Sequence, residues 1–358
     1  MKKSVPDKKP SMSIREMAKL AGVSPSTVSR ILNDPEGKIP FAPKTRQRII
    51  ELCQQKGYQP NVHAKRLFAG RSHVLALAVP PISQRVARES RQNNSNFIHS
   101  LAGIEEQATL NDQDLLLLTV NDRFCENKKY RSLFTSRAID GMLIWGGLWN
   151  EQYIGELFEE NYPIVMIGTR HANPDIAFVS VDNRQAGVLI AEHLIELGHR
   201  HVGYLTGELQ ASAAQERRDG FCQTCQRHNI QVTDYQGQFT YTSGYELTEK
   251  ILNQKDAPTA IGAASNSIAI GVYEAAMAHG LQVPSDLSIA ALEQESLFYS
   301  PRLTCIEMPI YKTGVLGTQL LLQLIEDHAK GTVTKLEKQQ ILPVAFKQGQ
   351  TTGPVLTQ

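Results

Sequence analysis

The sequence predicts an N-terminal three-helix helix-turn-helix head followed by an α/β body of two lobes built on parallel sheets. Three observations predict this fold class. The chain has 358 residues, too many for one ordinary core. Its first fifth is basic and the remainder is acidic. From Val74 onward, short apolar runs alternate with longer stretches of helical periodicity, the pattern of strands and helices in turn.

The composition is that of a globular protein, with 41% hydrophobic and 20% charged residues. No apolar run reaches the roughly 18 residues that a membrane-spanning helix needs. Residues 1–12 are basic but lack the apolar stretch of a signal peptide. We therefore expect a disordered basic tail over residues 1–12, no membrane partner and a cytoplasmic location.

The charge is divided unevenly along the chain. Residues 1–71 carry 15 Lys or Arg and 5 Asp or Glu, whereas the remaining residues carry 22 basic and 31 acidic side chains. A basic head on an acidic body indicates a polyanion-binding module joined to something else. A solubilising tail would explain only the lysines before Ser13, and not the cations inside the patterned segment that follows.

The head begins with a short amphipathic helix over Ser13–Ala21. Gly22 can supply the left-handed corner of a tight turn. Ser24 is a good N-cap and Pro25 suits a first helical position, so a second helix is expected over Pro25–Asn33. This is helix-turn-helix spacing. The stripe of the first helix is formed by Ile14, Met17, Ala18 and Ala21.

A third helix is expected over Pro43–Lys56, ended by Gly57. It closes a small three-helix core. The residues expected to close it are Ile49, Ile50, Leu52 and Cys53.

The second helix would lie in the major groove of DNA, with its N-terminal residues facing base edges. Its expected exposed residues are Pro25, Ser26, Ser29 and Arg30. Arg30 can donate two hydrogen bonds to guanine, although an ordinary surface arginine is the alternative. The short hydroxyl side chains of Ser24, Thr27 and Ser29 suit contacts with phosphates.

In the body, strands alternating with helices predict parallel sheets covered on both faces. Ligands of such folds bind beyond the carboxyl ends of the strands, which in a two-lobed protein is the crevice between the lobes. The expected strands are Val74–Val79, Leu115–Val120, Gly141–Trp145, Ile164–Ile167, Val202–Leu205, Ala260–Ala264 and Leu287–Leu292. The expected helices include Phe97–Leu110, Ala186–Leu197, Ala213–His228 and Ser267–Ala278.

Catalytic signatures are missing from the sequence. It contains neither a phosphate-binding G-x-x-x-x-G-K-[ST] loop nor a G-x-S-x-G elbow. Five scattered cysteines do not make a disulfide framework, and the Cys222–Cys225 pair lacks the other half of a zinc site. We expect two helix cysteines there, no metal, no cofactor and no enzyme activity.

The head resembles that of the lactose-repressor (LacI/GalR) family in two long strings. "SIREMAKLAGVSPSTVSRILN" is similar to the family's helix-turn-helix, and "TRQRIIELCQQKGYQPNVHAKRL" resembles its third helix and hinge. The resemblance implies a hinge helix that forms on DNA and inserts a leucine, here Leu67, into the minor groove. A linker or core leucine is the alternative. Asn61, Ala64 and Lys65 complete the DNA contacts that the resemblance implies.

The resemblance continues through the body, in "HLIELGHRHVGYLTG", "ERRDGF", "SNSIAIGVYEAAMAHGLQVPSDLSIAAL" and "PRLTCIEMPIYKTG". It implies a two-lobed, periplasmic-binding-protein-like core with three chain crossings between the lobes. The resulting organisation is a head over 13–58, a hinge over 59–71 and an effector-binding and dimerisation domain over 72–358. The first lobe is expected at about 72–170 and 303–330, and the second at about 171–302 and 331–358.

Ligand contacts follow from the resemblance position by position. Phe97 and Trp145 match aromatic ligand positions of the first lobe, and Arg217 matches an arginine that holds sugar hydroxyls. Asn266 and Glu293 stand where the family usually has aspartate, which indicates an unusual pocket. The alternatives are core packing for the two aromatics, a structural ion pair for Arg217 and a solvated strand end for Glu293.

The resemblance implies a nucleoid-associated repressor of carbohydrate-utilisation genes. Its partners would be a palindromic DNA operator, a small-molecule effector (a sugar above all) and a second copy in a homodimer. Control by a nucleoside or by a protein partner is the alternative, and an enzyme fused to a DNA-binding head is a further one.

Overall fold

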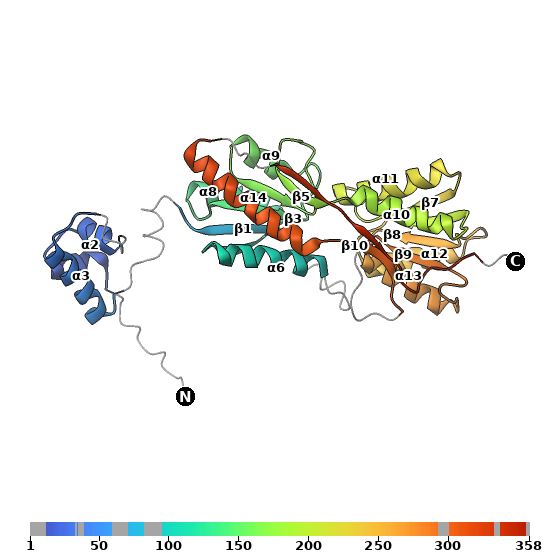
Figure 1. The fold of residues 1–358 in the computed structure, drawn as a ribbon, viewed down its shortest axis with the longest axis horizontal. Coiled ribbons are helices and arrows are strands. Elements are labelled where there is room, and N and C mark those ends of the chain that lie inside the picture. Colours follow the sequence, from blue (N-terminus) through green and yellow to red (C-terminus); the bar gives the residue numbers. More distant parts are fainter. Residues whose placement is uncertain are drawn as a thin grey trace, which may run out of the picture. The chain divides into compact units, whose positions relative to one another are not determined.

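The computed structural model describes residues 12–32, 34, 39–58, 71–81, 95–292, 301–332 and 337–355. The chain divides into two compact units, residues 1–73 and 74–358 (Figure 1). No helix among these described residues is both long and apolar enough to cross a membrane.

The first unit is a three-helix head of α1 (Ile14–Ala21), α2 (Pro25–Leu32) and α3 (Pro43–Lys56), as the sequence predicts. A capping box starts α1, in which the Ser13 hydroxyl and the Glu16 carboxylate satisfy each other's backbone amides. Gly22 ends α1 with φ of 64°, the left-handed corner expected of it. Local sequence signals therefore fix the helix-turn-helix geometry.

The head has a core of its own, formed where the three helices meet. Ile50 differs from expectation because it is 37% exposed. One residue further along a helix rotates the side chain by about 100°, which takes Ile50 off the buried stripe that Ile49 and Cys53 share. Its buried members are Met17, Ala18, Ala21, Val28, Ile31, Ile49 and Cys53.

The second unit contains two six-stranded sheets (Figure 1). All the strand pairs of the first sheet are parallel. Its spatial order is β11 (Gln339–Leu342), β5 (Phe178–Val181), β4 (Ile164–Ile167), β3 (Gly141–Trp145), β1 (Val74–Val79) and β2 (Asp114–Thr119).

Helices cover both faces of the first sheet, as expected for buried parallel strands. One face packs on α6 (Ser95–Leu110) and α14 (Ile310–Lys330). The other packs on α7 (Asp122–Glu126), α8 (Lys129–Thr135) and α9 (Gln152–Glu159). Successive residues of β1 alternate between these two cores, which is why that strand is apolar throughout.

The second sheet is parallel except at its edge strand β12, which is antiparallel to β10. Its order is β12 (Ala345–Lys347), β10 (Thr304–Glu307), β9 (Ser288–Ala291), β8 (Ala260–Ala263), β6 (His201–Leu205) and β7 (Gln231–Tyr235). The second lobe's helices are α10 (Asn183–Glu196), α11 (Ser212–Arg227), α12 (Tyr241–Leu252) and α13 (Asn266–Ala278).

The chain passes between the sheets three times, after β5, after β10 and after β11. The lobe boundaries expected from the sequence need correction. We placed β5 and β11 in the second lobe, but both pair within the first sheet, and β10, placed in the first lobe, pairs within the second. The reason is that each crossing follows a strand that first extends the sheet it is leaving.

Candidate functional site

Helix α2 presents a polar face at its start. The Ser24 hydroxyl accepts a hydrogen bond from the amide of Thr27 at 3.1 Å, which is the contact expected of an N-cap. Its Oγ also lies 2.7 Å from the Ser26 hydroxyl and 2.8 Å from that of Thr27. Ser24, Pro25 and Ser26 are exposed. The start of the helix therefore carries a compact set of hydroxyl groups suited to phosphate or base contacts.

The two faces of α2 differ in the way a DNA-reading helix requires. Val28 and Ile31 are buried in the core of the head, whereas Arg30 is exposed and Ser29 is half-buried. The exposure of Arg30 places its guanidinium at the surface of the head.

Five expected site residues lie outside the described residues. They are Asn61, Ala64, Lys65 and Leu67 of the expected hinge, and Glu293 of the expected effector site.

The two aromatic candidates of the first lobe lie together. Trp145 ends β3, and the Phe97 ring meets it edge-on with centroids 5.1 Å apart and planes at 67°. Phe97 is only 6% exposed and belongs to the core under α6, whereas Trp145 is half-buried at the margin of that core. Trp145 is thus the ring that a ligand could reach, with Phe97 fixing its orientation.

Arg217 is a buried cation of α11 in the second lobe, 5% exposed. Its Nη1 donates to the carbonyl of Ala264, just past the end of β8, at 2.6 Å, and its Nε donates to the Asn183 side chain at 2.9 Å. Asn266 starts α13 two residues beyond Ala264. Arg217 and Asn266 therefore both lie at the carboxyl end of β8, the edge at which ligands of such sheets bind.

Two further residues at this edge were missed from the sequence. The Phe239 ring lies under the Arg217 guanidinium at 6.0 Å and so close to Gly207 that a Cβ there would lie 2.3 Å from a ring atom. Asn183, 1% exposed, begins α10 and orients Arg217. The only sequence signal for Phe239 is a weak one, namely that Gly207, which its ring contacts, follows an apolar strand. Asn183 has no signal in the sequence beyond its place after β5.

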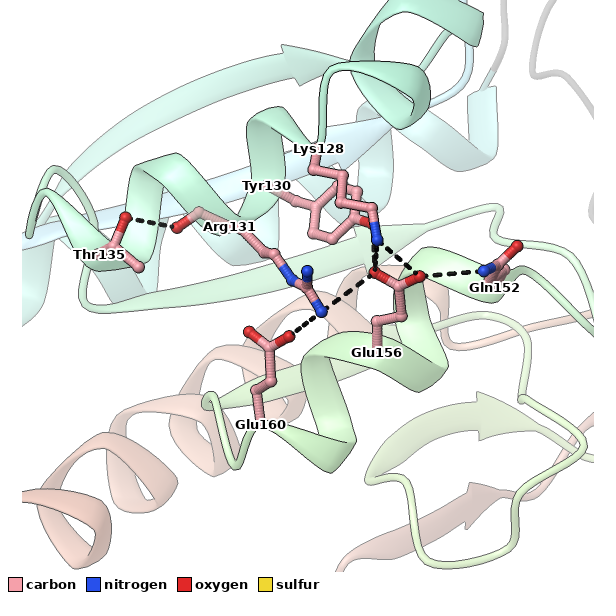
Figure 2. Close-up of polar contacts among 7 residues, drawn as sticks. All are labelled: Lys128, Tyr130, Arg131, Thr135, Gln152, Glu156 and Glu160. Atoms are coloured by element: carbon pink, nitrogen blue, oxygen red, sulfur yellow. Dashed lines mark hydrogen bonds and ion pairs between the residues drawn. The ribbon is translucent and has the colours of Figure 1, made fainter.

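A polar network of the first lobe joins α8 to α9 (Figure 2). The buried Tyr130 hydroxyl donates to the Glu156 carboxylate at 2.6 Å, and this bond is the main cause of the lowered pKa of Glu156. Lys128 pairs with the same carboxylate at 3.1 Å, and Arg131 bridges Glu156 and Glu160. Every charge is matched within the network, so it offers no reactive group.

The cysteines of α11 are free thiols packed against the second lobe's core. Burial raises the pKa of Cys222 to about 11 and that of Cys225 to about 12. Thiolate is the reactive form, so burial disfavours the reactive state of both side chains.

Two family models match the chain. That of "Bacterial regulatory proteins, lacI family" matches residues 13–61, and that of a periplasmic binding protein-like domain matches residues 191–352. The lacI model covers the head and the expected start of the hinge. The periplasmic binding protein-like model covers much of the second lobe, together with α14 and β11 of the first lobe.

Curated relatives align along most of their length. The HTH-type transcriptional regulator DegA of Bacillus subtilis is 31% identical over 310 residues, 84% of this chain and 88% of that protein. The probable HTH-type transcriptional repressor ExuR of the same organism is 29% identical over 91% of this chain and 94% of its own length. Catabolite control protein A of Priestia megaterium is 27% identical over 87% and 91%. The first is named as a transcriptional regulator, the second as a transcriptional repressor and the third as a control protein, which confirms the interpretation as a regulator and not an enzyme.

Solved structures share the fold. The Lac repressor dimer bound to operator and the anti-inducer ONPF superposes with a TM-score of 0.78 at 23% identity, over 96% of this chain and 99% of that one. The complex of the transcriptional regulator CelR with cellobiose gives a TM-score of 0.69 at 22% identity, over 95% and 99%. The expected architecture of head and two-lobed core is confirmed.

Proposed function

The chain belongs to the lacI family of bacterial regulatory proteins, and we propose that this DNA-binding transcriptional repressor controls carbohydrate-utilisation genes in response to a small sugar or sugar derivative. The effector binds between the two lobes, and the protein works in the cytoplasm at the nucleoid. The observation that carries this proposal is the buried Arg217, held over Phe239 at the carboxyl edge of the second sheet. A fixed fork of donors beside an aromatic ring suits a polyhydroxylated ring with an apolar face.

The first lobe supplies a second aromatic surface. Trp145 stands at the carboxyl end of β3 and is held by Phe97. Aromatic faces stack on the apolar faces of sugar rings, and Asn266 and Glu293 would match hydroxyl groups. Two structural relatives support this class of effector, because one is a cellobiose complex and another, from Enterococcus faecium, holds ribose.

The head binds a palindromic operator. Arg30 reads a guanine edge in the major groove, while Ser24, Pro25, Ser26, Thr27 and Ser29 position α2 on the backbone and base edges. Leu67 enters the minor groove between the two hinge segments, flanked by Ala64 and Lys65, with Asn61 on the backbone. Replacing Leu67 with Ala is then expected to weaken operator binding and leave effector binding unchanged. An unchanged operator affinity would contradict the insertion of Leu67 into the minor groove.

A palindromic operator requires two heads related by a two-fold axis, so the protein acts as a homodimer. Large apolar side chains are exposed on α6 and on its neighbour β2, at the edge of the first sheet: Ile98 at 57%, Leu110 at 70% and Leu117 at 53%. Exposed leucine on an edge strand is an aggregation hazard unless it is covered. A second copy covers it in this proposal.

The proposal is tested by sequencing genomic fragments retained by the purified protein at fixed, moderate salt, because phosphate binding depends steeply on salt. A palindromic site beside sugar-uptake or glycosidase genes is expected. Sugars named by those genes are then titrated against operator binding, with Arg217→Met as the variant that keeps operator affinity and loses the response. Retention of DNA without sequence preference, or a response to nucleosides and not to sugars, would overturn the proposal.

A further inference from the structure

The two lobes also touch outside the chain crossings, through two loops of the first lobe and the start of α11. The loop after β3 contributes Trp149, whose amide donates to the carbonyl of Gln210 at 2.8 Å. The loop after β4 contributes Thr169, whose hydroxyl lies 2.8 Å from that of Ser212. The amide of Arg170 donates to the same Ser212 hydroxyl at 2.9 Å. These contacts form a small seam between the lobes.

Arg170 is the centre of this seam. Its Nε donates to the carboxylate of Glu216 on α11 at 2.5 Å, and its guanidinium lies over the Trp149 ring at 5.3 Å. The ion pair is partly screened, since the Arg170 side chain is 45% exposed and that of Glu216 22%. An exposed pair contributes little to stability, so it can be made and broken at small cost.

Glu216 also faces inward, toward the effector site. The Asn183 amide donates to its other carboxylate oxygen at 3.5 Å, and the oxygen of the same amide accepts from Nε of Arg217 at 2.9 Å. Asn183 is buried and further tied to Ser180 and to the carbonyl of Val181, at the crossing after β5. One side chain therefore contacts both the effector-site arginine and the carboxylate of the seam.

We propose that Asn183 and Glu216 are positioning residues that couple Arg217 to the Arg170–Glu216 ion pair, and so link effector binding to the contact between the lobes. This inference rests on the proposed function in one respect, that Arg217 faces the effector. A ligand that moves the Arg217 guanidinium changes the hydrogen bond that the Asn183 oxygen accepts from it. The Asn183 amide then reorients, which alters its hydrogen bond to Glu216. The position of the Glu216 carboxylate changes as a result, and so does its ion pair with Arg170.

Linkage limits the size of the coupling between the effector and the contact between the lobes. A ligand shifts the balance between two lobe arrangements only as far as it binds them with different affinity. The contacts that lead from Arg217 through Asn183 and Glu216 to Arg170 provide that difference, because Asn183 touches both the ligand-facing arginine and the seam carboxylate of Glu216 in this arrangement. By reciprocity, weakening the seam changes the affinity for the effector.

The test needs neither DNA nor effector. The chain has two tryptophans, so the Trp145→Phe protein reports fluorescence from Trp149 alone, the ring that Arg170 covers. Acrylamide quenching is measured in this background for Glu216→Gln, which breaks the ion pair, and for Arg217→Met, which removes the donor to Asn183. The matched control is Arg218→Met on the same helix, whose partner is Asp234 at 2.5 Å.

Both Glu216→Gln and Arg217→Met are expected to raise the Trp149 quenching constant, while Arg218→Met leaves it unchanged. Melting temperatures recorded alongside separate loss of fold from loss of coupling, and Arg217→Lys replaces Arg217→Met if the latter does not fold. An unchanged Trp149 quenching constant in Glu216→Gln would contradict a role of the ion pair in the seam. An unchanged constant in Arg217→Met would contradict the relay, that is, the coupling from Arg217 through Asn183 to the ion pair. An equal rise with Arg218→Met also overturns the relay, since the effect would then be one of α11 as a whole. The proposed function stands or falls separately, by the DNA fragments.

Discussion

The carboxylate of Asp34 is held by the guanidinium of Arg46 at 2.6 Å, and this pair joins the end of α2 to α3. Arg46 also donates to the backbone carbonyl of Asp34 at 2.5 Å, and the Asp34 carboxylate accepts from the amide of Ile39 at 2.8 Å. Asp34 is only 7% exposed. The contact between the end of α2 and α3 is therefore partly polar, beside the small apolar core of the head.

Replacing Arg46 with Met should destabilise the head. The change leaves a nearly buried carboxylate without its cation, which costs about 1–3 kcal/mol. We expect a lower denaturant midpoint for the head and weaker operator binding, measured by urea unfolding and by a binding titration. Arg48→Met is the control, because Arg48 is exposed on the same helix. Equal effects of the two variants on the denaturant midpoint would show that the loss of a positive charge on α3, and not of the pair with Asp34, causes the destabilisation.

Replacing Arg30 with Ala should reduce operator affinity and relax the preference for one base pair. A bidentate arginine–guanine contact discriminates against the wrong base by about 1–3 kcal/mol. The measurement is a set of binding titrations against the operator and its single-base variants at one salt concentration. Lys56→Ala removes an equal charge from the last turn of α3 and should weaken all sequences alike. Unaltered base preference in the Arg30 variant would assign specificity to other residues.

The head and the central strands could be predicted from sequence because their signals are local. Ser13, Gly22 and Ser24 mark helix ends, and apolar runs such as Val74–Val79 are buried on both faces. The missed strands lie at or near sheet edges (β5, β7, β10, β11 and β12), although the edge strand β2 was expected as Leu115–Val120. β7 reads QVTDY and is exposed or half-buried throughout, so its composition does not distinguish it from a loop.

The candidate site likewise contains residues that could be predicted from the sequence and residues that could not. Arg217 was placed by resemblance to a family, but its neighbours Asn183 and Phe239 come from α10 and from the segment before α12, far from it in sequence. Which side chains surround a buried guanidinium depends on how these segments pack, and nothing in their local sequence states it. The aromatic pair Phe97 and Trp145 was expected to contact the ligand, with core packing as the alternative, and Phe97 lies in the core cluster beneath α6 while Trp145 is at its margin.

A charge placed on the exposed edge of the first sheet should separate the proposed dimer. Leu117→Glu puts a carboxylate on β2 where the leucine is 53% exposed, so the fold of the single chain is little affected. Burying an unpaired charge in an interface costs several kcal/mol, enough to shift a dimer to monomer at micromolar concentration. Sedimentation velocity measures the change. Met277→Glu, at a comparably exposed position on α13, is the comparison, and dissociation by that variant alone would move the interface to the second lobe.

Stability should fall as the pH is lowered through the histidine range. His193 and His199 lie in the second lobe, where burial is the main cause that lowers the pKa of each. His193 lies 2.9 Å from the Thr352 hydroxyl, and His199 lies 2.8 Å from that of Thr259. Their unfolded pKa is about 6.5, so below that pH the unfolded chain binds more protons than the folded one. The stability that the neutral rings contribute is therefore full above about pH 6.5 and is lost progressively below it.

Urea midpoints measured from about pH 8 down to about pH 5, a window that brackets the unfolded histidine pKa, provide the check. The midpoint should be steady above the unfolded pKa and fall below it. In His193→Gln the fall should be shallower, because one titrating group that resists protonation is gone while a hydrogen-bonding side chain remains near Thr352. His99→Gln, which changes an exposed histidine of α6, is the control variant. A slope that is the same in all three proteins would mean that carboxyl groups, and not these two buried rings, govern the acid sensitivity of the second lobe.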